Sequence, residues 1–389
     1  MEMLIAALLM IWGSLTAGHT DITFEQLVQA SLDLQKGTVE VPGTLPGTDA
    51  GLGLVKQDPQ TDAPVVKGLY STGNTAGGAR LASLLKLIDE TELNALVIDI
   101  KDDWGNITYK TDHPELAALG NSKKFIGDIT KLMLTLQEHQ VYPIARVVVF
   151  KDTYLANKKP ELSFLNANGT VWTNGKKESF VNPYKKEVWD YNIQVAKEAA
   201  KLGFKEIQFD YVRFPEGFEK RADILKYDKD KRTRVQVVTE FVKYAREQLN
   251  PLGVRVSVDI FGFAASVPAA EGIGQDFEGI SRYVDVICPM VYPSHYSTGW
   301  FGSKVPDAAP YVTIAGAMED THTKLLPLGG LKPVIRPWIQ DFTAPWISGY
   351  IRYGKNEVEQ QIKALKDNGV NEYLLWNSGN VYSAGVDYK

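Results

Sequence analysis

The sequence predicts a (β/α)8 barrel, and three observations support this fold class. Eight short apolar runs alternate with longer amphipathic ones between residue 65 and the C-terminus. The apolar runs are nearly continuous, as in strands of a parallel sheet that helices cover on both faces. Eight such units also suit the usual length of a barrel. A doubly wound open sheet is the alternative, but the first run leads into GNTAGG, which lacks the GxGxxG spacing of its phosphate loop.

The order of the elements follows from these runs. The predicted strands lie at 65–72, 95–103, 141–150, 206–214, 254–263, 284–293, 332–341 and 371–379. Residues with a helical apolar period lie between them, at 79–93, 125–140, 187–203, 233–249 and 357–369. Each helix thus follows a strand, which is the repeating unit of the barrel.

The chain before the barrel divides into two further segments. Residues 1–18 contain the apolar run LIAALLMIW followed by small residues, which resembles a signal peptide, although Glu2 stands where a basic residue is usual. Residues 19–64 hold a short helix and then a linker rich in proline and glycine. We therefore expect three segments, 1–18, 19–64 and the barrel at 65–389. The first favours a protein that is secreted or held at the cell envelope, by a membrane or cell-wall contact.

Composition excludes several classes of function. The chain has 389 residues, 44% of them hydrophobic, and a net charge of −5, so it lacks the basic field of a nucleic-acid-binding protein. One cysteine and five histidines without an HExxH pattern give no metal site, and we expect no cofactor. Nothing in the sequence indicates an oligomeric state.

Polar and aromatic residues gather where the predicted strands end. Because side chains alternate between the two faces of a strand, residues of one parity point into the barrel, and active sites lie at its C-terminal rim. Asp210 lies inside an apolar strand, where an unpaired carboxylate costs several kcal/mol. The candidates for one site are Tyr70, Asp99, Lys101, Arg146, Gln208, Asp210, Asp259, Tyr292, His295, Arg336, Trp338, Gln340, Asp341 and Trp376.

This mixture of residue types suits a carbohydrate. Carboxylates and guanidinium groups bind sugar hydroxyls, and aromatic faces stack on the apolar face of a sugar ring. The candidate platforms are Trp104, Tyr211, Trp338 and Trp376. Arg213 has odd spacing from Asp210, so we expect it to point out of the barrel or into the following loop.

Four motifs carry a resemblance to a known family. FDYVRFP, VIDIKDDWG, SVDIFG and PMVYPSHY together resemble a bacterial family of glycosyl hydrolase domains of formerly unknown function, from about Val66 to the C-terminus. More distantly, the chain is similar to α-amylase-like, α-galactosidase-like and endo-α-1,4-polygalactosaminidase-like barrels. The resemblance implies a (β/α)8 glycoside hydrolase whose strand-four aspartate, Asp210 here, is the nucleophile.

The resemblance also implies an acid/base on strand five or six. Asp259 is the acidic residue late in strand five, where many relatives have glutamate, and strand six carries none at its C-terminal end. Asp99, Asp103 and Asp341 remain alternatives for the acid. Arg146 or Lys101 is expected to keep Asp210 charged.

Two other kinds of function stay open. One is a barrel that binds a glycan without cleaving it, since fold does not dictate function. The other is a different enzyme class, but a Schiff-base aldolase needs a lysine late in strand six or seven, which this sequence lacks. We expect hydrolysis of a polysaccharide, an α-linked glycan of the bacterial surface or exterior.

Overall fold

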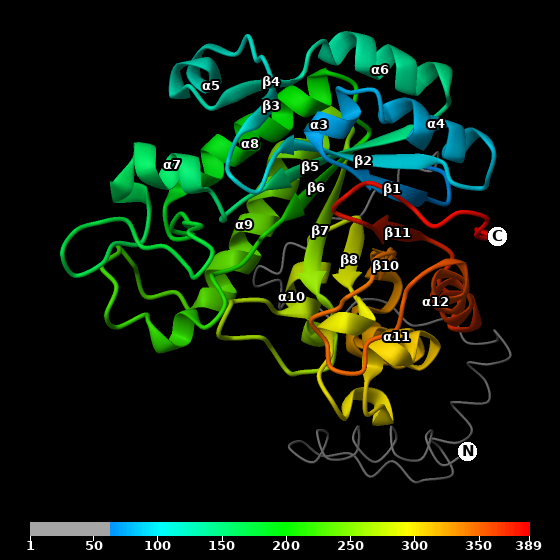
Figure 1. The fold of residues 1–389 in the computed structure, drawn as a ribbon. Helices are drawn as coiled ribbons and strands as arrows, with labels where there is room; N and C mark the ends of the chain where they lie inside the picture. The colour runs from blue at the N-terminus through cyan, green and yellow to red at the C-terminus, as the bar shows by residue number, and fades with distance from the viewer. Residues whose placement is uncertain (1–62) are drawn as a thin grey trace, which may run out of the picture. The chain divides into compact units, whose positions relative to one another are not determined.

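The computed structural model describes residues 63–389, and these form a closed barrel of eight parallel strands surrounded by helices (Figure 1). The predicted fold class is therefore confirmed. The predicted segment at 1–18 and the linker up to residue 62 lie outside the described residues. Within the described residues, none of the helices is long and apolar enough to span a membrane.

All eight predicted strands are present. They are β1 (Lys67–Ser71), β2 (Ala95–Lys101), β5 (Tyr142–Val148), β6 (Glu206–Asp210), β7 (Arg255–Phe261), β8 (Val286–Met290), the pair β9 (Val334–Ile335) and β10 (Trp338–Gln340), and β11 (Tyr373–Trp376). The barrel closes because β1 pairs in parallel with both β2 and β11. The seventh strand is split at Pro337, which has no N–H to donate to a neighbouring strand.

The helices follow the strands as expected. The five predicted helices correspond to α4 (Leu81–Asp89), α6 (Ile129–Glu138), α8 (Lys186–Lys201), α9 (Arg234–Leu249) and α12 (Lys355–Asp367). The other α-helices of residues 63–389 are α3 (Gly73–Ala76), α5 (Pro114–Leu119), α7 (Thr153–Lys158), α10 (Phe277–Ser281) and α11 (Pro310–Leu325). Asp128 caps α6 by accepting the N–H of Lys131, so this helix begins later than the predicted residue 125.

An insertion after β2 was not predicted. Strand β3 (Ile107–Tyr109) pairs antiparallel with β2, and β4 (Ser122–Ile126) pairs with β3, so that Phe125 and Ile126 are strand residues rather than the start of a helix. Strands of three to five residues give too short a pattern to recognise in the sequence.

The apolar residues form two layers, as the period of two requires. The outer layer packs the strands against the helices and includes Leu96, Val147 and Phe209. The inner layer fills the barrel with Val97 and Trp338, among others. The inner layer is small because charged residues share the barrel interior with it.

Candidate active site

A cavity of about 870 Å³ lies at the C-terminal ends of the barrel strands. Seven of the fourteen predicted site residues line it: Arg146, Asp210, Asp259, Tyr292, His295, Trp338 and Trp376. Five of them lie on β5, β6, β7, β10 and β11, and Tyr292 and His295 lie in the loop after β8. Most strands of the barrel therefore contribute to the cavity. Because burial removes these polar groups from water, each one destabilises the fold unless it is hydrogen-bonded or paired with an opposite charge.

Asp210 is the last residue of β6, and both of its carboxylate oxygens are hydrogen-bonded. Oδ2 accepts Nε and Nη2 of Arg146, at 3.0 and 2.6 Å, and Oδ1 accepts the backbone N–H of Tyr211 at 2.5 Å. Tyr211 has a φ of 51°, an unusual conformation for a bulky residue that persists only where its surroundings hold it. Asp210 is thereby kept in the barrel interior as a fully bonded carboxylate.

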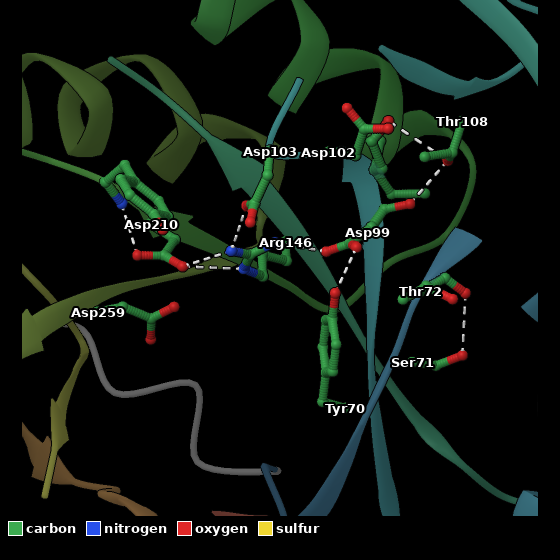
Figure 2. Close-up of polar contacts among 12 residues, drawn as sticks. Tyr70, Ser71, Thr72, Asp99, Asp102, Asp103, Thr108, Arg146, Asp210 and Asp259 are labelled. Atoms are coloured by element: carbon green, nitrogen blue, oxygen red, sulfur yellow. Dashed lines mark hydrogen bonds and ion pairs between the residues drawn. The ribbon is translucent and has the colours of Figure 1, made fainter. Parts of the chain in front are cut away.

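Arg146 stands at the centre of a charge cluster. Besides Asp210, its guanidinium binds Asp99 at 2.6 Å and Asp103 at 2.9 Å. The hydroxyl of Tyr70 donates to the second oxygen of Asp99 at 2.6 Å. Figure 2 shows these side chains converging on Arg146. One buried cation therefore binds three carboxylates, and the expectation that Arg146 pairs with Asp210 agrees with this geometry.

The two other carboxylates of the cluster differ in their electrostatics. Burial raises the pKa of Asp99 to about 6, against the opposing charge of Arg146. Burial also acts on Asp103, but the charges of Arg146 and Lys151 outweigh it and lower the pKa of Asp103 below its ordinary value. Asp103 is thus ionised, whereas Asp99 takes up a proton in mildly acidic solution.

Asp259 is buried on β7 and accepts the indole N–H of Trp338 at 2.7 Å. Burial, reinforced by the negative charge of Asp210, raises the pKa of Asp259 well above its ordinary value. Figure 2 shows its carboxyl group on the same side of Arg146 as that of Asp210. The cavity thus contains one carboxylate bound to a cation and one carboxyl group that favours its protonated form.

Aromatic rings form one wall of the site. Trp376 stacks on Tyr70 with a distance of 4.1 Å between ring centroids, and Trp338 meets Trp376 edge to face. Tyr292 lies beside Trp376, and His295 packs against Tyr292. Burial lowers the pKa of His295, so its imidazole is neutral near pH 7. The wall offers apolar faces, with polar groups at their edges.

Lys101 does not belong to this site, and the period of two was misleading there. A β-bulge at Ile100 shifts the pairing of β2 with β5, so that Asp99 lies opposite Arg146 but Lys101 lies opposite Val147. Lys101 therefore leaves the barrel interior. Its ammonium group, fully buried, binds Asp152 at 2.7 Å and Asn192 of α8 at 3.1 Å.

Four further predicted residues lie outside the cavity lining. Arg336 pairs with Glu206 and Glu372 at the other end of the barrel, and Gln208 contacts Cys288 in the interior. Gln340 accepts the N–H of Ser294 and donates to Asp307, while Asp341 accepts Ser383. Strand parity identifies inward residues, but it does not give their height in the barrel or what the loops above them occupy.

Arg213 was expected to point out of the barrel or into the following loop, and it was not among the predicted site residues. The chain turns at Tyr211, so strand parity no longer applies to Arg213, whose guanidinium lies in the cavity wall between the rings of Tyr211 and Phe261, at 4.7 Å from each centroid. Lys151 was missed as well; it binds Asp103 and Glu178. Since both follow a strand end, only the loop conformation could have located them.

The chemistry of the cluster is that of ion pairs. The described part of the chain contains no group of three His, Cys, Asp or Glu side chains placed to hold a metal ion. Instead, the carboxylates of Asp99, Asp103 and Asp210 all bind Arg146.

No curated protein matches the chain. A hypothetical protein from Ruminiclostridium thermocellum is 38% identical over 49% of this chain and 96% of its own, with a TM-score of 0.45. The glycoside hydrolase domain of PgaB (BpsB) from Bordetella bronchiseptica is 12% identical over 82% of this chain and 95% of its own, with a TM-score of 0.56. At that identity the likeness shows a shared fold.

The model of one family, described as "Putative glycosyl hydrolase domain", matches residues 68–382, which span the barrel from β1 to beyond β11. The chain belongs to this family of glycosyl hydrolase domains.

Proposed function

We propose that the protein hydrolyses the glycosidic bonds of a polysaccharide, an α-linked glycan of the bacterial surface or exterior. One observation carries the proposal: two carboxyl groups share one cavity in opposite electrostatic environments. Asp210 is bound to the Arg146 guanidinium, and burial raises the pKa of Asp259 well above its ordinary value. Glycoside hydrolysis requires such a pair, one group ionised and one protonated.

The two groups have distinct roles in this reaction. Asp259 donates its proton to the oxygen of the leaving sugar, which no longer departs as an alkoxide. Asp210 attacks the anomeric carbon or stabilises the positive charge that develops there. Asp259, now deprotonated, activates a water molecule that completes hydrolysis. Arg146 holds the Asp210 carboxylate at a fixed position throughout.

The cavity supports a carbohydrate ligand. Its volume of about 870 Å³ is near the upper end of the usual range for ligand pockets. Trp376, which is partly exposed, provides a ring face for a sugar, with the buried rings of Trp338 and Tyr292 beside it. Arg213 and Glu216 provide polar groups at the outer wall. Export, with a membrane or cell-wall contact through residues 1–18, remains part of the proposal.

Glycan binding without catalysis is the second candidate. The observation that favours it is that both oxygens of Asp210 are occupied by hydrogen bonds, which makes the carboxylate a weaker nucleophile. In that case the aromatic wall and the charge cluster would hold a glycan chain without cleaving it.

The test is release of reducing ends by the full chain from bacterial exopolysaccharides, cell-wall glycans and α-glucans. Asp210→Asn and Asp259→Asn are each expected to lower the rate about 10³-fold or more. Asp307→Asn is the control, because Asp307 is a buried rim aspartate that binds Gln340 outside the cavity lining. Binding of a glycan with no release would favour the second candidate. Undiminished release by Asp210→Asn would contradict the assignment of that residue.

A further inference from the structure

A second, smaller cavity lies at the same rim of the barrel. Its volume is about 200 Å³, and it is formed where β1 and β2 end, by Tyr70, Thr72, Gly73, Asn74, Asp99, Asp102, Asp103, Trp104, Thr108 and Phe125. Asp103 lines both this cavity and the larger one. In Figure 2, Thr72, Asp102 and Thr108 lie on one side of Arg146, and Asp210 and Asp259 on the other. The smaller cavity thus lies on the side of Arg146 that faces away from the two carboxyl groups, and Asp103 is common to both cavities.

Trp104 is the most unusual residue of the smaller cavity. Trp104 is large and apolar, yet it is 50% exposed. Its backbone, in contrast, is tightly held: its N–H donates to Asp102 Oδ1 at 2.9 Å, and its C=O accepts the N–H of Tyr154 at 3.0 Å. An exposed indole on a fixed backbone is a preorganised platform, because binding a ligand there costs little loop ordering.

The next residue, Gly105, packs closely against Asp152. Gly105 has a φ of +88°, and a Cβ there would lie 1.9 Å from Asp152 Oδ1. Asp152 is itself fixed by its buried ion pair with Lys101. The buried pair therefore holds the loop that carries Trp104, although neither Lys101 nor Asp152 lines either of the two cavities described.

The polar groups around Trp104 suit hydroxyl groups. Asn74 is exposed at the cavity wall, and the Asp103 side chain is 39% exposed although it binds Arg146 and Lys151. An amide and a partly exposed carboxylate both accept hydrogen bonds from hydroxyls. An aromatic face with hydrogen-bonding groups beside it is the same combination as in the larger cavity.

We infer that the smaller cavity is a second sugar-binding subsite for the same glycan, and that the enzyme cleaves inside a chain. This inference rests on the proposed function. The glycan runs from the larger cavity past Asp103, and a sugar unit on the other side stacks on Trp104. A site for terminal units needs a closed end beyond the cleavage point, whereas here a further cavity follows.

The experiment uses oligosaccharides from disaccharide to octasaccharide, prepared from the polysaccharide that the full chain cleaves and labelled at the reducing end. For the longer members, Trp104→Ala is expected to lower kcat/KM about tenfold, which corresponds to about 1.4 kcal/mol. The shortest cleaved member is expected to react at the parent rate, because it does not reach Trp104. Trp104→Phe should recover most of the loss, since it retains an aromatic face.

Leu134→Ala is the control, because Leu134 on α6 is 56% exposed and lines neither cavity. Internal cleavage with a length-dependent loss in Trp104→Ala supports the inference. Release of terminal units alone, or an equal effect of Trp104→Ala at every length, overturns it while hydrolysis stands. If no polysaccharide is cleaved, the proposed function fails, and this inference fails with it.

Discussion

Replacing Arg146 with methionine tests whether this residue neutralises the carboxylates of the site. Methionine has a similar length and no charge, so the change removes the cation without opening a large cavity. Arg146 makes four hydrogen bonds to three carboxylates. After its loss each carboxylate keeps one partner: Tyr70 for Asp99, Lys151 for Asp103 and the Tyr211 N–H for Asp210.

The expected loss of stability follows from these contacts. Removing one partner of a buried ion pair typically costs about 3–5 kcal/mol. In a chain of this size, with about 2.1 cal/mol/K of unfolding entropy per residue, that corresponds to a decrease in Tm of roughly 5 °C. The remaining partners place the effect towards the lower end of the range, because no carboxylate becomes entirely unpaired.

The loss of stability in Arg146→Met should increase as the pH rises. In the parent, burial raises the folded-state pKa of Asp99 to about 6, and removal of Arg146 raises it further. A group whose folded pKa is raised gives its full stability below the unfolded pKa, about 4, and loses it as the pH rises through the folded pKa. The Tm difference between parent and variant should therefore be smaller near pH 5 than near pH 8.

Thermal unfolding of the full chain followed by circular dichroism at both pH values measures this difference. Arg336→Met is the matched control, because Arg336 is equally buried and binds two carboxylates at the other end of the barrel. Both variants should lose stability, but only Arg146→Met should abolish glycan hydrolysis. A Tm decrease of equal size at both pH values, or no decrease near pH 7, would refute the role assigned to Arg146.

Three further predictions concern other buried groups. In the parent, the free energy of unfolding should fall by roughly 3 kcal/mol as the pH rises from about 4 to about 6, because burial raises the pKa of Asp99 to about 6. Urea unfolding of Asp99→Asn should lack this pH dependence, and an unchanged pH dependence would mean that another group causes it. Trp338→Phe removes the indole N–H that lowers the pKa of Asp259. The alkaline limb of the pH profile of kcat/KM on the cleaved glycan should therefore move up by about one pH unit. A limb that does not move would exclude Asp259 as the proton donor. Lys101→Met leaves Asp152 buried without its cation and should cost about 3–5 kcal/mol in thermal unfolding. KM for the shortest cleaved oligosaccharide, which does not reach Trp104, should stay constant; a raised KM for that substrate at parental stability would be the contrary result.

The barrel was predictable because its signal is repeated. Eight apolar runs separated by amphipathic ones agree with one another, so an error in any single run does not change the fold class. Helix α11 escaped notice because its apolar period is interrupted by Gly316 and by six consecutive polar residues at 319–324. The insertion of β3 and β4 escaped because its strands are short.

The site was predictable only as far as regular strands extend. The alternation of side chains along uninterrupted strands correctly placed three residues in the barrel interior: Arg146, Asp210 and Asp259. Lys101 follows the bulge, and Arg213 follows the turn at Tyr211, so strand alternation does not give the direction of either side chain. Local backbone irregularities depend on tertiary contacts, which a periodicity argument does not contain.

The bulge at Ile100 has a consequence for comparing this chain with other barrels. A strand without the extra residue would carry the counterpart of Asp103 one position earlier in its sequence. An alignment without a gap would then equate inward residues of one barrel with outward residues of the other for the rest of that strand and its loop. Residue equivalences at the rim above β2, Asp103 and Trp104 included, must therefore be taken from superposed backbones.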